Sequence, residues 1–173
     1  MKPHNGIKPH DLLILLYITE YCEDGFTVMN ISKALKISQS EISESLNRSK
    51  IGKLIGHDKN IFRKSLYELL IYGVKHMFPI IPGNIVRGVA TSHSALPLSE
   101  LIVSGGESYV WQYSNGKARG MSVKPLYKTV PEISEELPEL IELLTLVDAL
   151  RIGRTREVNL AKDELKERLL SNE

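Results

Sequence analysis

The sequence predicts a mainly α-helical protein with one small β-hairpin. Apolar residues recur at helical spacing in several segments, which are bounded by capping residues, glycines and prolines. An Asn115-Gly116 pair lies between two short stretches of aromatic and small residues, as in a two-residue hairpin turn. Hydrophobic residues make up 42% of the 173 residues, so the chain can bury a core without disulfides or metal ions.

The first two helices are expected at His10–Tyr21 and Val28–Leu35. Asp11 favours the start of the first helix because a carboxylate interacts well with the positive end of a helix. The sequence Glu23-Asp24-Gly25 ends that helix, and Thr27 is placed to act as the N-cap of the second. The first helix has a broad apolar face, made by Leu12, Leu13, Leu15, Leu16 and Ile18.

The third helix is expected from Gln39 to about Lys50. Ser38 and Glu41 have the spacing of a capping box, in which the serine hydroxyl accepts from the backbone N–H of Glu41 and the carboxylate reaches back to Ser38. Ile42 and Leu46 share one face, four residues apart, and the other faces are polar. The order of these three helices is typical of tri-helical DNA-binding domains.

A long fourth helix is expected from about Ile61 to Met77, where Pro79 and Pro82 follow. The stretch Leu54–Asn60 is too short for two strands and a turn, so a hairpin wing after the third helix is expected to be rudimentary or absent. Residues 1–60 are therefore expected to form a helix-turn-helix domain. Residues 61–173 are expected to form an α/β extension that serves as a dimerisation or partner region.

The rest of the extension follows from local signals. Residues 80–107 are expected to be largely irregular, with a short helical or extended piece near Leu96–Val103. Two helices are expected at the end of the chain, at Pro138–Ile152 and at about Arg156–Leu170, with Gly153 as the C-cap of the first. The long fourth helix and these two helices are the expected dimer surfaces.

The hairpin is expected over residues 108–123. Its register would pair Tyr113 with Ala118, Trp111 with Gly120 and Tyr109 with Ser122, which places large rings opposite small residues. The aromatic rings then either pack on the core or form a stacking surface for nucleic acid. Core packing is the favoured interpretation, because aromatic faces are more often buried than used for stacking.

Charge is distributed unevenly along a chain of net charge +1. The basic maximum lies between Asn47 and Lys64, whereas residues 131–173 carry 6 basic and 11 acidic residues. This balance excludes a strongly cationic nucleic-acid coat protein and an acidic disordered tail. The basic segment between Asn47 and Lys64 indicates that the N-terminal part of the chain binds an anionic partner. A solvated surface of mixed charge is the alternative.

The string ISKALKISQSEISESLNRSKIGKLI resembles the helix-turn-helix of winged-helix bacterial regulators, the MarR-like group among them. Ser32 stands where that family prefers a small residue, and Lys36 stands at the turn where it often has Gly, so a left-handed backbone is expected at Lys36. The whole chain is also similar to a group of uncharacterised bacterial helix-turn-helix proteins that contain sequence motifs such as FPIIPGNIVRGVATSHSALPL. The buried positions of the helix-turn-helix pattern are filled by Ile31, Leu35, Ile37, Ile42 and Leu46.

The resemblance implies a sequence-specific transcriptional regulator that binds double-stranded DNA with residues 39–50 in the major groove. Asn and Gln can form paired hydrogen bonds with adenine, and Ser can donate or accept. Cations and a helix N-terminus suit phosphates. The residues expected to face base edges are Gln39, Ser40, Ser43 and Asn47, and those expected to contact phosphates are Thr27, Arg48, Lys50 and Lys53. The alternative is a three-helix bundle whose outer residues are merely polar.

A second basic site is expected in the extension, where the chain carries Lys117, Arg119, Arg151, Arg154 and Arg156. The three arginines around Gly153 either complement the carboxyl end of the preceding helix or contact phosphate or a second subunit. The hairpin cations could replace the missing wing.

Other classes of function have little support. No G-x-S-x-G turn or phosphate-binding loop is present, and the five histidines lack ligand spacing with one another or with Cys22. We therefore expect no enzyme activity, no metal and no cofactor; an enzyme using Arg87, His93 and the arginines of 151–156 is the weaker rival. Cysteine usage and the lack of an apolar span or signal sequence predict a cytoplasmic protein without a membrane partner.

The expected assembly is a homodimer, because two half-sites one helical turn apart increase the affinity of small helix-turn-helix domains. The main alternative function is a protein-interaction module, such as an antitoxin-like or adaptor subunit. In that case the acidic C-terminal third and the aromatic hairpin would bind a protein partner.

Overall fold

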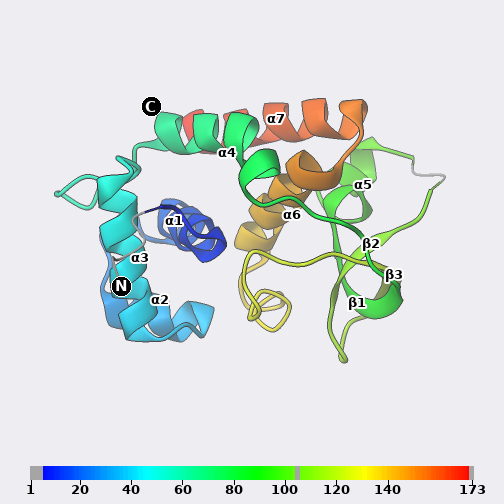
Figure 1. Cartoon of the computed structure of the whole chain (residues 1–173), viewed down its shortest axis with the longest axis horizontal. Coiled ribbons are helices and arrows are strands. Elements are labelled where there is room, and N and C mark those ends of the chain that lie inside the picture. The colour runs from blue at the N-terminus through cyan, green and yellow to red at the C-terminus, as the bar shows by residue number, and fades with distance from the viewer. Residues whose placement is uncertain (1–5, 104–105, 172–173) are drawn as a thin grey trace.

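The computed structural model describes residues 6–103 and 106–171. Within these residues the chain is a mixed α/β protein, about 53% helical, with seven α-helices and a small three-stranded sheet (Figure 1). The predicted helix-rich class with a small β part is thus confirmed. The elements are α1 Pro9–Tyr21, α2 Val28–Leu35, α3 Gln39–Ile51, α4 Arg63–Met77, β1 Ile85–Thr91, the 3-10 helix η1 Ser92–Ser94, α5 Leu98–Leu101, β2 Tyr109–Gln112, β3 Ala118–Ser122, α6 Pro138–Ile152 and α7 Thr155–Leu170.

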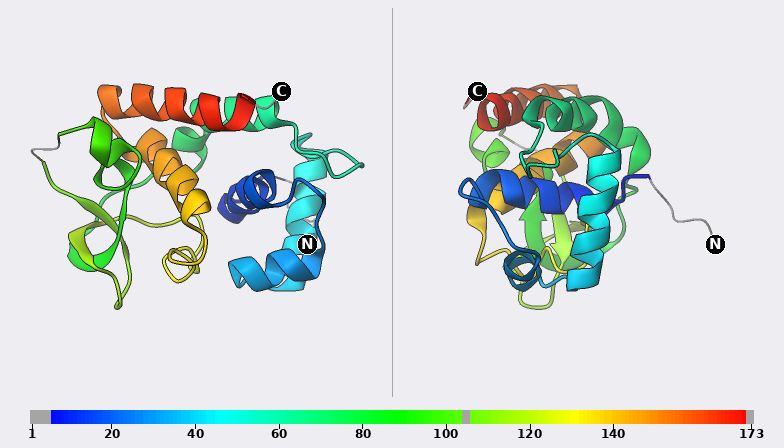
Figure 2. Two further views of the ribbon diagram at one scale, coloured as in Figure 1. Left: turned by 180° about the vertical axis from the view of Figure 1, so that it is seen from behind. Right: turned by 90° about the vertical axis from the view of Figure 1, so that its left-hand side faces the viewer.

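The first three helices lie at one end of the molecule, away from the strands (Figures 1 and 2). Their bounds and caps confirm the prediction. The Thr27 hydroxyl accepts a hydrogen bond from the Asn30 N–H at 3.2 Å, and the Ser38 hydroxyl accepts one from the Glu41 N–H at 3.3 Å. Lys36 ends α2 in the left-handed region, at φ 54° and ψ 40°.

The chain between α3 and α4 makes only a minimal sheet contact. One antiparallel bridge joins Ile55 to Ile61, and the Gly56 N–H donates to the Asn60 carbonyl at 2.8 Å. This confirms that the segment is too short for two strands of a full hairpin. The fourth helix begins at Arg63, slightly later than expected, and Phe62 is exposed.

Helix α6 is the centre of the core. It contacts α1, α4, α7, η1 and β1, and its side chains from Leu143 to Leu150 are buried on every side of the helix. Burying one Leu side chain completely stabilises the folded state by about 1.5–3 kcal/mol. The expectation that α6 forms a dimer surface is therefore wrong, because its residues from Leu143 to Arg151 are all buried. Helix α7 lies beside α4 across the top of Figure 1.

The sheet differs from the predicted hairpin. Residues 85–91, expected to be irregular, form β1, which runs antiparallel to both β2 and β3. β2 and β3 pair in parallel at Tyr109 with Met121, which closes a small barrel. The predicted pairings of Tyr113, Trp111 and Tyr109 across a hairpin are therefore wrong.

Glycine explains how this barrel closes. A Cβ added at Gly88, in the middle of β1, would lie 1.9 Å from the carbonyl oxygen of Trp111. A Cβ added at Gly116 would lie 2.2 Å from the backbone of Gly88. The backbones before and after the Asn115-Gly116 turn therefore pass close to Gly88 from two sides, and each strand pairs with β1 instead of pairing as a hairpin.

A buried polar network joins the barrel to α6. The Asp148 carboxylate accepts hydrogen bonds from the Thr91 hydroxyl at 2.8 Å and the Trp111 indole N–H at 2.7 Å, and Arg151 Nη1 lies 2.7 Å from its other oxygen. Trp111 is 1% exposed, so for this ring core packing is confirmed. Arg151 also donates from Nε to the Phe78 carbonyl at 2.8 Å, at the end of α4.

Candidate nucleic-acid interface

Helix α3 presents one continuous polar stripe at the outer end of the molecule. Figure 2 shows α3 as the nearest element when this end faces the viewer, with α1 behind it. The opposite side of α3 is buried against the core at Ile42, Ser45, Arg48 and Ser49. Residues three or four apart lie on one helical face, and the exposed stripe consists of Ser40, Ser43, Glu44, Asn47 and Lys50.

The side chains predicted to face base edges are all exposed. Ser40, Ser43 and Asn47 belong to the stripe, and Gln39 lies beside them in the first turn of α3. None of the four donates or accepts a side-chain hydrogen bond within the described part of the chain. Their donors and acceptors are therefore free for an external partner.

Arg48 is in a different place from the one predicted. It is 5% exposed, and its guanidinium forms two hydrogen bonds with Asp11 of α1, from Nε to Oδ2 at 2.9 Å and from Nη2 to Oδ1 at 2.7 Å. The Asp11 side chain beside it raises the pKa of Arg48, so this guanidinium stays charged. A buried, paired arginine cannot reach a phosphate, so the predicted phosphate contact by Arg48 is wrong.

The two lysines that were predicted to contact phosphates flank a shallow depression. Lys50, at the end of α3, and Lys53 line it together with His57 and Phe62. Lys53 has a left-handed backbone, at φ 53°. Both lysines are exposed and have no ion pair within residues 6–103 and 106–171. The C-terminal end of the α3 stripe is therefore its most positive part.

Thr27 lies in less favourable surroundings for an anion. It is exposed at the start of α2, with its hydroxyl used as the N-cap. The hollow beside it is lined by three carboxylate residues, Glu23, Asp24 and Asp58, and by Lys59. A phosphate at this helix end would interact with the positive helix dipole but also with nearby negative charge.

Two carboxylates also belong to α3. Glu41 accepts hydrogen bonds from Ser38 and from Tyr127 at 2.9 and 3.1 Å, and these donors, Ser38 first, lower its pKa. Glu41 is thus held at the edge of the helix by protein groups. Glu44 lies within the exposed stripe, 3.7 Å from Arg48 Nη1, and is the one acid there whose carboxylate can meet a partner.

Sequence reasoning missed the contacts that tie the turn before α3 to residues 127–136. Lys36 Nζ lies 3.1 Å from Glu132 and 3.2 Å from Glu136, and Thr129 donates to the Leu35 carbonyl at 2.8 Å. The acidic run around Glu135 was the available signal. Its partner could not be identified because Lys36 lies about a hundred residues away.

The predicted second basic site does not exist as one cluster. Lys117 pairs with Glu135 at 3.0 Å, Arg119 is opposite Arg87 across β1 and β3, and Arg151 is buried beside Asp148. Arg151 also bonds to the end of α4 and not to the end of its own helix. Only Arg154 and Arg156 share a site, a pocket that they line together with His93.

In residues 6–103 and 106–171 no helix is long and apolar enough to span a membrane, and no group of three or more His, Cys, Asp or Glu side chains is arranged to hold a metal ion. Comparisons with protein-family models, with curated proteins and with solved structures found no match. Any statement about function therefore depends on the residues of this chain.

Proposed function

We propose that the protein is a sequence-specific regulator of transcription that binds double-stranded DNA with α3 in the major groove. In this proposal α2, the turn at Lys36 and α3 act as a helix-turn-helix, and the Ile55–Ile61 bridge is a reduced wing. The major groove is about 12 Å wide and admits one helix. Such a regulator would act in the cytoplasm of a bacterial cell.

The observation that carries the proposal is the exposed stripe of α3. The stripe presents amide and hydroxyl side chains that no other residue of the described chain engages, and these are chemical groups that read base edges in the major groove. Asn47 and Gln39 are the candidates for paired hydrogen bonds to adenine. Glu44, in the same stripe, can accept from the amino group of cytosine.

Phosphate contacts would come from the cations at the end of α3. Lys50 and Lys53 are exposed and unpaired in the described chain, and phosphate contacts give affinity without sequence information. Arg48 supports binding in another way, because its ion pair with Asp11 holds α3 against α1. Thr27 is a weaker contact because of the acidic hollow beside it.

The proposed regulator is a homodimer, with one α3 in each half-site. Helices α4 and α7 offer the surface for this, since α6 is enclosed by the rest of the molecule (Figure 1). Tyr72 on α4 is 72% exposed, and an aromatic ring of this kind is enriched in protein interfaces.

The experiment is selection of duplexes from a random pool, followed by anisotropy titrations on the selected site and on point-altered sites. Asn47→Ala should relax preference at one position by about 1–3 kcal/mol. Asn84→Ala removes an exposed asparagine side chain before β1, away from α3 and from the proposed dimer surface, and is the matched control that should leave both affinity and preference unchanged. Absence of enrichment of any sequence, or binding unaffected by Asn47→Ala, would contradict the proposal.

A second candidate is a protein-interaction module, such as an antitoxin-like or adaptor subunit. It is favoured by apolar side chains that the fold leaves exposed in and after α4, Tyr72, Met77 and Ile81, which is 92% exposed. A stoichiometric protein partner that copurifies with the protein, together with no DNA binding, would favour this function over the first.

A further inference from the structure

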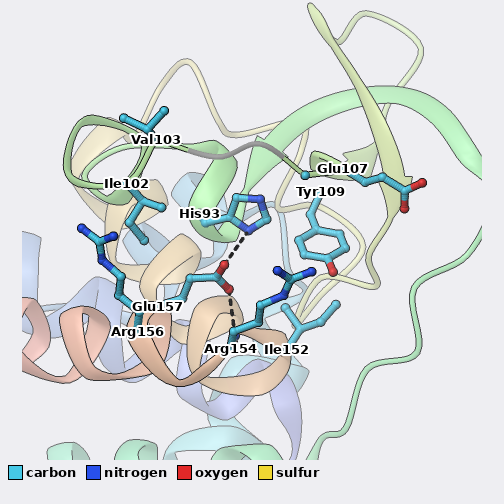
Figure 3. A pocket seen from close by; sticks show the side chains of 10 residues that line it. His93, Ile102, Val103, Glu107, Tyr109, Ile152, Arg154, Arg156 and Glu157 are labelled. Atoms are coloured by element: carbon cyan, nitrogen blue, oxygen red, sulfur yellow. Dashed lines mark hydrogen bonds and ion pairs between the residues drawn. The ribbon is translucent and has the colours of Figure 1, made fainter.

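A pocket of about 560 Å³ lies at the start of α7 (Figure 3), at the end of the molecule opposite α3 (Figure 1). Its wall is made by η1, β2 and the first turn of α7. The charged and aromatic residues that line it are His93, Glu107, Tyr109, Arg154, Arg156 and Glu157. Ile102 and Ile152 supply apolar surface. The volume is in the range of small-molecule sites.

His93 is the buried polar group of this pocket. It is 6% exposed, and its Nδ1 is buried without a hydrogen-bond partner within the described residues. Nδ1 lies 3.7 Å from Glu157 Oε1, which is an ion-pair distance but not a hydrogen bond. The ring also stacks edge-on against Tyr109, with centroids 5.2 Å apart. A buried polar atom left unpaired costs free energy, which a bound ligand can recover.

Two free cations stand at the mouth of the pocket. Figure 3 shows the guanidinium groups of Arg154 and Arg156 on either side of Glu157. Neither guanidinium group is within ion-pairing distance of a carboxylate in residues 6–103 and 106–171, although Glu157 and Glu107 line the same pocket. The second oxygen of Glu157 accepts a hydrogen bond from the backbone N–H of Arg154 at 2.9 Å. Glu107 points away from His93 (Figure 3).

The N-terminal end of α7 contributes an electrostatic field that favours anions. α7 is 16 residues long, and its N-terminal end carries partial positive charge. Glu157 already caps this end through the Arg154 N–H, so an anionic ligand would bind the flanking guanidinium groups rather than the helix end itself. Bidentate binding of planar oxyanions is the geometry that arginine prefers.

We propose that this pocket binds a small organic oxyanion, a carboxylate or a phosphate monoester. Arg154 and Arg156 place two positive charges on either side of the single Glu157 carboxylate and hold the anionic group. Its oxygen approaches His93, and the apolar body packs against Tyr109, Ile102 and Ile152. The inference does not rest on the proposed DNA binding, because no residue of α3 lines the pocket.

The test uses the full chain and four defined probes. Phenyl phosphate and benzoate share a ring and differ in the anion, inorganic phosphate lacks the ring, and benzyl alcohol lacks the charge. Binding is followed by calorimetry and by the amide shifts of Tyr109, Arg154 and Glu157 in NMR spectra. We expect saturable binding of phenyl phosphate or benzoate, weaker binding of inorganic phosphate, and none of benzyl alcohol. The tighter of the first two identifies the anion.

Variants then locate the site. Arg154→Gln and Arg156→Gln should each weaken binding about tenfold or more, as expected for a lost charge-assisted hydrogen bond. Arg119→Gln makes the same charge change on the exposed face of β3 and should bind like the unaltered protein. The proposal is overturned if neither aromatic anion saturates at millimolar concentration, if benzyl alcohol binds equally well, or if the double variant of Arg154 and Arg156 retains full affinity.

Discussion

Arg48 and Asp11 form a buried, two-point ion pair that joins α3 to α1. The Asp11 carboxylate is fully buried and also accepts from the Lys8 N–H at 2.8 Å, so one side chain both caps α1 and holds α3. Arg48 Nη2 lies a further 3.1 Å from His10 Nε2. The orientation of the exposed stripe of α3 is therefore set by a polar contact on the opposite side of the same helix.

Arg48→Met should destabilise the fold by about 3–5 kcal/mol, because it leaves the Asp11 carboxylate buried without its counter-charge. The measurement is the free energy of unfolding from urea titrations followed by circular dichroism. Lys50→Met is the matched control: it changes the same charge on the exposed side of α3 and should shift stability by no more than about 0.5 kcal/mol. Equal effects of the two substitutions would show that the pair does not hold α3.

The salt dependence of DNA binding should reflect two lysines per subunit. If Lys50 and Lys53 each neutralise one phosphate, a dimer should show a log–log slope of about −4. Lys50→Ala should reduce the slope to about −2, because each subunit loses one contact. Anisotropy titrations over a series of salt concentrations measure the slope. An unchanged slope in Lys50→Ala would place the phosphate contacts elsewhere.

Stability should fall as the solution is acidified through the titration range of His10. Burial, followed by the repulsion from Arg48, lowers the pKa of His10 below its ordinary 6.5, although Asp11 acts in the opposite direction. The unfolded chain therefore binds more protons than the folded one below about pH 6.5, so the free energy of unfolding decreases there. His10→Gln should remove this loss, as seen by urea unfolding between pH 8 and 5.

The control for this titration is His57→Gln, which removes an exposed histidine and should retain the acid dependence of the unaltered protein. The account of His10 fails if both variants lose the dependence equally, or if neither does.

Asp148→Ala should destabilise the fold by about 3–5 kcal/mol, because Arg151 would remain buried without its carboxylate. The side chain of Trp111, the only tryptophan, would also lose its hydrogen-bond acceptor. Urea unfolding followed by tryptophan fluorescence measures both effects, as a lower midpoint and an altered native emission. Native emission that does not change would contradict the Trp111–Asp148 hydrogen bond.

The helices could be predicted from sequence because their signals are local. The caps at Thr27 and Ser38 and the glycine after α6 all lie where the chain turns. β1 could not be predicted in this way. Its partners are distant in sequence, Gly88 interrupts the strand, and the preceding prolines and glycine indicate a loop. The Asn115-Gly116 turn signals a reversal correctly but does not specify which strand each flank pairs with.

The exposed part of the candidate site was also predictable, and the burial of Arg48 was not. Spacing within α3 is enough to place Ser43 and Asn47 on its outer face. Arg48 has the residue type of a surface cation, and nothing near it in sequence indicates a partner 37 residues away on α1. The pocket around His93 was equally hidden, because it combines η1 with the start of α7.

Contact between DNA and the outer face of α3 can be mapped residue by residue in a duplex titration monitored by NMR. A duplex chosen by selection is added to nitrogen-15-labelled protein at low salt, and amide shifts are mapped by residue. We expect the largest shifts along Gln39–Lys50 and at Lys53. Shifts confined to the barrel and α7, or no shifts with any duplex, would contradict it.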